Sequence, residues 1–504
     1  MTQPLNILLI TSDQQHYDTL GTLNTRIKTP NLDRLTREGT RFNRAYTASP
    51  VCSPSRSTII TGLYPSSHGC WNLGCKLPED VPTVGQHLHA MGYQTTLIGK
   101  AHFQPLASTP DCESLECQPL LRDLEFWRDF HGPWYGFDHI ELARNHTDEA
   151  HVGQHYALWM EEKGLANWRD YFEPWPPRPG EPVRRHRWDL PPEFHYTTWT
   201  AERSMAAIEQ SVSSDTPFFV WASFHDPHPS YLVPEPWASM YDPNEMQLGT
   251  LEAGEFDAMP PHYAMTQTDE PDFSAYRENG HWLHGFHSHK FDADELRKDM
   301  AIYYGMISFM DEQIGRILDK LDELGIAENT LIVFTTDHGH FLGQHGLMAK
   351  GAFHYEDLLR VPFLVRCPGM VPAGQSSDAL QSLVDLAPTF LDAAGARIPR
   401  NMQGVSQLGV WRGIQPTARD NVIAEFRHQP TTLHLRTYVD DRWKMTIYHG
   451  QDYGELFDLQ SDPEERHNLW DDANHQADRT RVMHRFLNAE LQREPMVSPQ
   501  VAGA

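Results

Sequence analysis

The stretch Asn-Ile-Leu-Leu-Ile-Thr-Ser-Asp-Gln-Gln, residues 6–15, decides the class of fold. Its first six residues, Asn6 to Thr11, form a nearly continuous apolar run, which is typical of a strand buried on both faces of a parallel sheet. The run gives way to polar residues that include Asp13 and Gln14. In open α/β sheets ligands collect at the carboxyl ends of strands, so this segment also predicts where a site lies.

Further strands and helices alternate along the chain. The other candidate strands are 94–99, 218–224, 330–336 and 363–366. Proline start signals, glycine stop signals and three- and four-residue apolar steps predict helices at about 30–38, from Ser53-Pro54, at 83–91 and at about 294–324. This alternation predicts an α/β fold with a large, mostly parallel sheet flanked by helices.

Polar clusters follow four of the predicted strands. They are Asp13, Lys100, His225 to His228, and Asp337 with His338. Because the carboxyl ends of parallel strands meet at one edge of a sheet, we expect these clusters to build a single site.

The rest of the chain predicts two insertions and a second unit. Residues from about 104–215 and 230–290 are rich in Pro, His and Trp, and we interpret them as irregular insertions that wall the site or, alternatively, fasten loops to the core. From about residue 415, strands at 433–437, 443–448 and 454–459 and a helix at 476–493 predict a smaller antiparallel subdomain. The expected division is a catalytic domain, 1–414, and a C-terminal α+β subdomain, 415–504.

Composition excludes several classes of protein. The net charge of −27 over 504 residues makes the chain a poor non-specific binder of nucleic acid or of an anionic membrane. No run approaches the roughly 18 apolar residues of a membrane span, and the N-terminus lacks a secretory pattern. Six cysteines form no disulfide framework, so we expect reduced thiols and a cytoplasmic location.

The sharpest local motif is Cys-Ser-Pro-Ser-Arg at 52–56, followed by Thr-Gly-Leu-Tyr-Pro at 61–65. It places Cys52 at a helix N-terminus with Arg56 one turn in, where free N–H groups and a cation favour an anion or a lowered thiol pKa. Two other interpretations stay open: a buried thiol beside a surface arginine, and a thiolate nucleophile whose activating base the local sequence does not supply.

This motif resembles the signature of the formylglycine-dependent sulfatases of the alkaline-phosphatase superfamily. Similar motifs follow in the family's order, and together they span residues from about 5 to 470. They are Thr-Pro-Asn-Leu-Asp-Arg-Leu (29–35), Ile-Gly-Lys-Ala-His (98–102), Asp-Pro-His-Pro (226–229), Thr-Thr-Asp-His-Gly (335–339), Leu-Gly-Gln-His-Gly (342–346) and Glu-Leu-Phe-Asp-Leu with its flanking residues (455–469). The resemblance implies an alkaline-phosphatase-like fold and oxidation of Cys52 to formylglycine (3-oxoalanine) by a separate formylglycine-generating or other sulfatase-maturing enzyme.

The resemblance also implies one divalent cation, held by Asp13, Gln14, Cys52 (as residue 52), Asp337 and His338. Oxygen ligands with one imidazole suit Ca²⁺, the expected ion, and leave Mn²⁺ and Mg²⁺ open. Asp-Gln and Asp-His depart from the Asp-Asp and Asp-Asn pairs of many sulfatases and look more like the choline-sulfatase and phosphonate-monoester-hydrolase branches. Gln14 is expected as a neutral ligand, the alternative being that it only supports the ligands.

The other matched residues divide the catalytic work. By resemblance, Arg56 fixes the formylglycine and balances charge at the metal, while Lys100 and Lys350 grip the sulfate oxygens. His102 helps to break the hemiacetal, and His228 protonates the leaving oxygen, a role that suits a pKa near neutrality.

Three further residues are weaker candidates. Asn72 follows the nucleophile helix and is a candidate substrate contact. His225 and His345 are weaker candidates for catalytic histidines, because most of the 29 histidines must be structural or exposed.

Three functions compete. The first is hydrolysis of a small sulfate monoester, favoured by the Gly-Lys-x-His pattern at 99–102. The second is hydrolysis of phosphonate monoesters or phosphodiesters by the same machinery, in a branch that tends to replace that Lys and His. The third is a non-catalytic relative, which would have lost a nucleophile, metal ligand or lysine, and none is missing. The organic part of the substrate and the oligomeric state, a homo-oligomer included, stay open.

Overall fold

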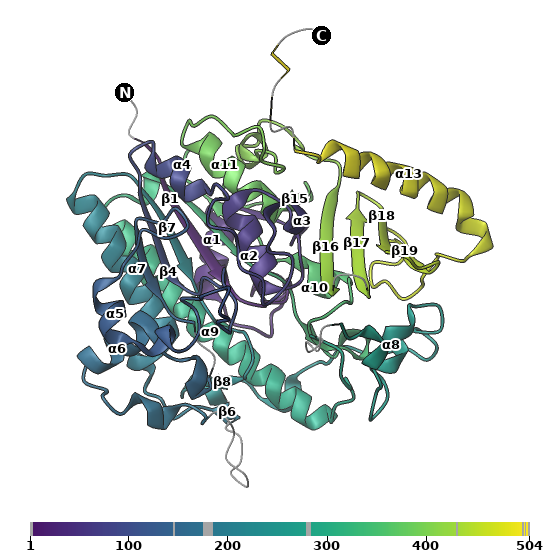
Figure 1. Ribbon diagram of the computed structural model, residues 1–504, viewed down its shortest axis with the longest axis horizontal. Coiled ribbons are helices and arrows are strands. Elements are labelled where there is room, and N and C mark those ends of the chain that lie inside the picture. Colours follow the sequence, from purple (N-terminus) through teal and green to yellow (C-terminus); the bar gives the residue numbers. More distant parts are fainter. Residues whose placement is uncertain are drawn as a thin grey trace.

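The computed structural model describes residues 4–144, 147–174, 185–278, 284–429, 432–495, 498 and 500–501. An eight-stranded sheet runs through the main body in the order β14-β2-β13-β9-β1-β7-β4-β5 (Figure 1). Its strands are β1 (Asn6–Ser12), β2 (Thr40–Phe42), β4 (Gln94–Gly99), β5 (His139–Leu142), β7 (Phe218–Ser223), β9 (Thr330–Thr336), β13 (Leu364–Arg366) and β14 (Gln375–Ser377). The strands from β9 to β5 are mutually parallel, whereas β13 is antiparallel to both neighbours. The predicted α/β class with a mostly parallel sheet is confirmed.

Helices cover both faces of this sheet because alternate side chains of β1 point in opposite directions. Ile7 and Leu9 join the core cluster beneath one set of helices, and Leu8 and Ile10 join the cluster beneath the other. The first set is α2 (Cys52–Thr61), α4 (Val84–His89) and α11 (Leu386–Ala393). The second set is α1 (Pro30–Glu38), α7 (Tyr196–Ser213) and the 31-residue α9 (Ala293–Glu323). All four β1 side chains are fully buried, as a strand between two helical layers requires.

Short elements complete the body. They are α3 (Pro65–His68), α5 (Leu124–Asp129), α6 (Gln154–Glu162), α8 (Pro261–Met265), α10 (Glu356–Leu359), α12 (Leu408–Trp411), β3 (Ala45–Tyr46), β6 (His186–Arg187), β8 (Leu232–Val233), β10 (Phe341–Leu342), β11 (Met348–Ala349), β12 (Arg360–Val361) and β15 (Gln381–Ser382), besides single 3₁₀ turns.

The interpretation of the first insertion as irregular is wrong in part. Residues 104–215 contain the edge strand β5 and helices α5, α6 and α7. Four residues with two polar side chains gave too weak a signal for a strand, and three threonines mask the periodicity of α7. Trp168, Trp188 and Trp199 pack in a core cluster of their own, so they fasten the insertion. The second insertion is mostly irregular, but it contains the short strand β8 and the short helix α8. Residues 145–146, 175–184 and 279–283 lie outside the described residues.

The C-terminal part forms a four-stranded antiparallel sheet covered by one helix (Figure 1). The strands are β16 (Val422–Gln429), β17 (Leu433–Val439), β18 (Trp443–Tyr448) and β19 (Gly454–Asp458), and the helix is α13 (Gln476–Gln492). The sequence predicted the last three strands and the helix but not β16. Among the described residues, no helix has both the length and the apolar character to cross a membrane, and all six cysteines are free thiols.

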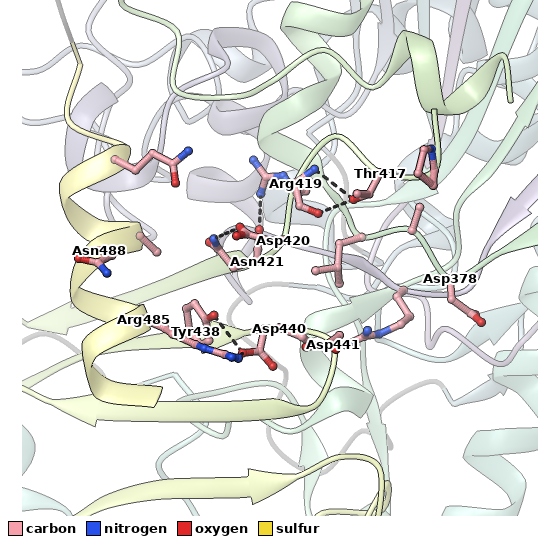
Figure 2. A pocket seen from close by; sticks show the side chains of 16 residues that line it. Asp378, Thr417, Arg419, Asp420, Asn421, Tyr438, Asp440, Asp441, Arg485 and Asn488 are labelled. Atoms are coloured by element: carbon pink, nitrogen blue, oxygen red, sulfur yellow. Dashed lines mark hydrogen bonds and ion pairs between the residues drawn. The ribbon is translucent and has the colours of Figure 1, made fainter. Parts of the chain in front are cut away.

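A cavity of about 690 Å³ lies where the C-terminal sheet meets the main body (Figure 2). Its lining comes from both parts, and two of its arginines are paired. Arg485 Nη1 lies 2.9 Å from Asp440 Oδ2 within the lining, and Arg419 Nη2 lies 2.8 Å from Asp385 Oδ1 outside it. None of the predicted site residues lines it. We therefore interpret it as the joint between the two parts, and the boundary near residue 415 stays a prediction.

Candidate active site

Cys52 opens helix α2 directly after the extended residue Val51 and is 1% exposed. Its Sγ lies 3.7 Å from Asp13 Oδ1, 3.3 Å from His338 Nε2 and 3.0 Å from Lys350 Nζ. Burial and the Asp13 carboxylate raise the pKa of this thiol despite the nearby lysines. A buried thiol with a raised pKa argues against the interpretation as a simple thiolate nucleophile.

Four side chains converge here as candidate metal ligands. Asp13, Cys52, Asp337 and His338 are buried and offer ligand atoms that all lie within 4.8 Å of one another. The two aspartates lie side by side because β1 and β9 are paired in parallel to their last residues, Ser12 and Thr336. The His338 Nδ1–H donates to the carbonyl of the next residue at 2.9 Å, and burial lowers the pKa of His338 to about 4. Its Nε2 therefore carries a free lone pair, as a metal ligand needs.

Gln14 adds an amide oxygen to this set. Its backbone has a φ of 59°, in the left-handed region, and its N–H donates to Asp337 Oδ1 at 3.0 Å. The side-chain Nε2 lies 2.7 Å from His340 Nδ1, whereas Oε1 is buried with no hydrogen-bond partner among the described residues. An orphaned buried amide oxygen beside two carboxylates and a neutral imidazole fits a hard divalent cation.

Arg56 joins the two carboxylates. Its Nε donates to Asp337 Oδ2 at 2.9 Å, its Nη2 lies 3.4 Å from Asp13 Oδ2, and its Nη1 donates to the Lys100 carbonyl and to Ser223 Oγ. Lys100 Nζ forms a short ion pair with Asp13 Oδ2. Burial opposes ionisation of Asp13, but Lys100 and the other nearby cations outweigh it and hold the pKa of Asp13 well below its usual range. The hydrogen bonds of Arg56 among the described residues go to these groups rather than to Cys52, and its role at the metal and at residue 52 stays a prediction.

Lys350 and His228 lie on the outer side of Cys52. Lys350 Nζ is 3.3 Å from His338 Nε2 and 3.5 Å from His228 Nε2. Lys350 is buried, whereas His228 is only partly buried. His228 is therefore the more accessible of these two side chains.

His102 lies on the inner side, again in the left-handed region with a φ of 59°. Its N–H donates to Glu116 Oε1 at 2.6 Å, and its ring Nε2 lies 3.4 Å from Arg144 Nη2. Burial, Arg144 and Lys100 hold the pKa of His102 well below its usual range. The ring is therefore neutral.

The three weaker candidates lie around the site or away from it. Asn72 Nδ2 donates to the carbonyl of His428 on β16 at 2.7 Å, so the C-terminal sheet reaches this side. His225 Nε2 donates to the Ala143 carbonyl at 2.8 Å. His345 lies 2.5 Å from Glu255 Oε1, and its ring stacks on a tyrosine. We interpret both histidines as structural.

Comparison with known proteins identifies the family. The sequence profile described as Sulfatase matches residues 5–396. The chain belongs to the sulfatase family. A second profile, described as "N-sulphoglucosamine sulphohydrolase, C-terminal", matches residues 343–493. The predicted family and the assignment as an enzyme are confirmed.

Individual relatives cover most of this sulfatase. It is 29% identical to an arylsulfatase of Clostridium perfringens (strain 13 / Type A), covering 97% of this chain and 94% of the relative. It is 26% identical to a choline-sulfatase of Rhizobium meliloti (strain 1021), covering 87% and 79%. Among solved structures, the phosphonate monoester hydrolase of Agrobacterium radiobacter superposes with a TM-score of 0.79 at 25% identity, covering 99% and 98%. Both branches named from the metal motif are thus among its relatives.

Sequence reasoning missed three residues of this sulfatase. Arg144 follows β5, His428 lies on β16, and neither strand was recognised. His284 lies in the second insertion; burial, Lys350 and His338 hold its pKa well below the usual range, which places it beside the site. Of these three residues, only Arg144 could have been found from the sequence, because it follows a strand of the main sheet. Finding it would have required recognition of β5.

A second cluster with metal-ligand chemistry combines two residues of β5 with one residue that precedes it. His131, His139 and Glu141 offer atoms within 4.8 Å of one another. Both Glu141 oxygens, however, accept bonds from Arg203, at 2.7 and 2.8 Å. The carboxylate is already neutralised by a bidentate partner, so we interpret this cluster as an ion pair.

Proposed function

We propose that this sulfatase hydrolyses the sulfate monoester of a small substrate and releases inorganic sulfate, with residue 52 as nucleophile after conversion of Cys52 to formylglycine. One observation carries the proposal: the side chain of Cys52 lies among Asp13, His338 and Lys350, at the strand ends of a sulfatase fold. Its relatives include named sulfatases, which supports sulfate-ester chemistry.

The proposed cofactor is one divalent cation, with Ca²⁺ as the ion and Mn²⁺ or Mg²⁺ as alternatives. Asp13, Gln14, Asp337, His338 and residue 52 would hold it. Once bound, such an ion polarises sulfate oxygens and lowers the pKa of a coordinated hydroxyl. Residue 52, once converted and hydrated, would supply one hydroxyl as the nucleophile towards sulfur and a second hydroxyl whose loss of a proton would release sulfate.

The remaining residues bind the transferred group and move protons. Lys100 and Lys350 hold its oxygens and stabilise the charge that grows on them, a contribution that often dominates catalysis. His228, at the opening, donates a proton to the leaving alcohol oxygen. His102 takes the proton of the second hydroxyl. Arg56 keeps both metal-binding carboxylates ionised and in place.

Asn72, beside His428, is the proposed contact to the organic part of the substrate. A maturing enzyme for Cys52 belongs to the proposal as a partner. The cytoplasmic location stays a prediction.

A phosphonate monoester or phosphodiester hydrolase is the second candidate. The similarity to a phosphonate monoester hydrolase structure and the Asp-Gln and Asp-His pairs favour it. Lys100 and His102 favour the sulfatase, because they crowd the side where phosphorus carries an extra organic group.

The test compares kcat/KM for a sulfate monoester, a phosphonate monoester and a phosphodiester, with conversion of Cys52 measured by mass spectrometry. The sulfate ester is expected to be fastest. A faster phosphonate or diester would replace the first candidate with the second.

The metal is tested by elemental analysis and by chelation. Asp337→Ala is expected to lose both the ion and the activity, whereas Asp319→Ala, on the exposed side of α9, keeps both. Full activity of metal-free protein would exclude the cation from the mechanism.

A further inference from the structure

Arg144 carries a buried positive charge with no carboxylate bound to it. The side chain is 1% exposed, and no ion pair to it exists among the described residues. Its Nε and Nη1 have no hydrogen-bond partner there, and Nη2 meets only His102 Nε2 at 3.4 Å. A buried unpaired charge is costly, so a guanidinium in this state indicates a partner that comes from outside the protein.

The backbone holds Arg144 at the edge of the sheet where the site lies. Leu142 at the end of β5 pairs with Gly99 at the end of β4, directly before Lys100. Ala143 N–H donates to the Gly99 carbonyl at 3.1 Å, and His225 Nε2–H donates to the Ala143 carbonyl at 2.8 Å. Two backbone bonds thus fix the residue before Arg144, and the arginine is one more polar side chain after a parallel strand.

Glu116 is the nearest candidate for an internal partner, but its oxygens are used elsewhere. Oε1 accepts the His102 N–H at 2.6 Å, and Oε2 accepts the Gln104 N–H at 2.7 Å. The carboxyl is therefore bound to the backbone of the Lys100–Gln104 loop. It lowers the cost of burying Arg144 through space without occupying the guanidinium.

The exposed fractions of the site residues indicate which part of a substrate Arg144 contacts. Lys100 and Arg144 are each 1% exposed, and His102 is 5% exposed, whereas His228 on the opposite side is only partly buried. An organic leaving group must extend towards the more exposed side. The transferred group lies at the inner end, among Lys100, His102 and Arg144.

We infer that Arg144 is a further oxyanion-binding residue of this sulfatase, and that one of its unpartnered N–H groups, on Nε or Nη1, donates to an oxygen of the transferred sulfate group and of the sulfate released. The N–H groups of Nε and Nη1 point to different sides of the planar guanidinium, so one of them can donate to an oxygen of a tetrahedral anion while the positive charge strengthens that bond. The inference rests on the proposed function for the identity of the anion. It adds a donor that none of the matched motifs contains.

The experiment measures binding of inorganic sulfate by thermal unfolding of the full chain, with chloride at equal ionic strength as reference. A ligand that binds only the folded state raises the unfolding temperature. Sulfate is expected to raise it for the unmodified protein, and Arg144→Gln is expected to weaken sulfate binding at least tenfold. Arg144→Lys is expected to retain part of the shift, because lysine keeps the positive charge but lacks the planar guanidinium group.

Two matched variants separate binding from structure. Arg128→Gln, an exposed arginine of the same insertion paired with Glu162, is expected to bind sulfate as the unmodified protein does. Glu116→Gln is expected to keep the sulfate shift, whereas a purely structural Arg144–Glu116 pair predicts that Glu116→Gln and Arg144→Gln behave alike. If Arg144→Gln does not fold, the inference is tested with Arg144→Lys, through its sulfate-induced shift and through the inhibition constant of sulfate as product.

The outcomes distinguish this inference from the proposed function. Unchanged sulfate binding and inhibition in both Arg144 variants, or no sulfate binding by the unmodified protein, overturns the inference even if sulfate esters are hydrolysed. Arg144-dependent sulfate binding in a protein without sulfatase activity upholds the oxyanion site and overturns the proposed function.

Discussion

The start of α2 and the end of β5 each bring a buried arginine to the same site. Arg56 is fully buried and bonded to two carboxylates, a backbone carbonyl and a hydroxyl. Arg144 is almost as deeply buried, yet two of its three nitrogens have no partner among the described residues. A buried charge whose hydrogen-bond partners come from the protein stabilises the fold. A buried charge without such partners is available to a ligand. The following experiments test this distinction.

The largest effect is expected next to Arg56. Cys52→Ala removes the proposed nucleophile but leaves every bond of Arg56 intact, so turnover is expected to fall below detection while the protein stays folded. Initial rates measure turnover, and circular dichroism measures whether the protein stays folded. Cys75→Ala, a half-buried thiol outside the cluster, is the control and should retain full activity. Activity in Cys52→Ala would sink the proposed mechanism.

Substitution of the two arginines should lower the free energy of unfolding by different amounts. Arg56→Met leaves Asp13 and Asp337 buried without their shared cation, and breaking such a buried pair costs about 3–5 kcal/mol. Arg144→Met removes a charge without a bound carboxylate, so a loss below about 1 kcal/mol is expected. Denaturant unfolding at neutral pH measures both. Equal losses would mean that Arg144 is part of the scaffold after all.

Lys100 is both paired within the protein and proposed to bind substrate. It forms an ion pair with Asp13, and it is proposed to face the transferred group. Lys100→Ala is expected to lower kcat/KM for a sulfate monoester by about 10²- to 10³-fold, or roughly 2–4 kcal/mol of transition-state stabilisation. The loss on a phosphonate monoester is expected to be smaller. Equal losses on both substrates would assign Lys100 to support of Asp13 alone.

His345 extends the comparison to a buried cation away from the site. Burial opposes its protonation, but Asp357 and Glu255 raise its pKa from 6.5 to about 9. A raised folded-state pKa means that this stabilisation is complete below pH 6.5 and is lost as the pH rises through 9. The unmodified protein is expected to lose about 2 kcal/mol more than His345→Gln between these values, as measured by denaturant unfolding. The exposed His467→Gln serves as control, and identical profiles for His345→Gln and the unmodified protein would refute the assignment.

The sequence predicted the parts of the fold that depend on long apolar runs. Strands β1, β4 and β9 and helix α9 appear within one or two residues of their predicted bounds, because burial on two faces or a long apolar stripe leaves a strong pattern. The strand ends then placed Asp13, Lys100 and Asp337 in one site. Strand β5 is short, lies at the edge and carries two polar residues, so Arg144 was assigned to an irregular loop.

Other features depend on tertiary contacts that no local pattern reveals. His428 reaches the site only because the C-terminal sheet packs against the loop that holds Asn72. The orphaned Gln14 oxygen and the unpartnered Arg144 nitrogens are properties of the folded environment. Residue type and spacing identify a cation or an amide, but not whether the protein itself provides its partner.

The burial of Cys52 has a consequence for the order of events during synthesis. In the folded chain its side chain is 1% exposed and is enclosed by His338 and Lys350, which leave the ribosome almost 300 residues later. An enzyme that converts this cysteine must therefore reach it before β9 has joined β1. The proposed conversion would therefore compete with folding, and the fraction of active molecules would depend on the rate of translation and on the supply of the proposed maturing enzyme.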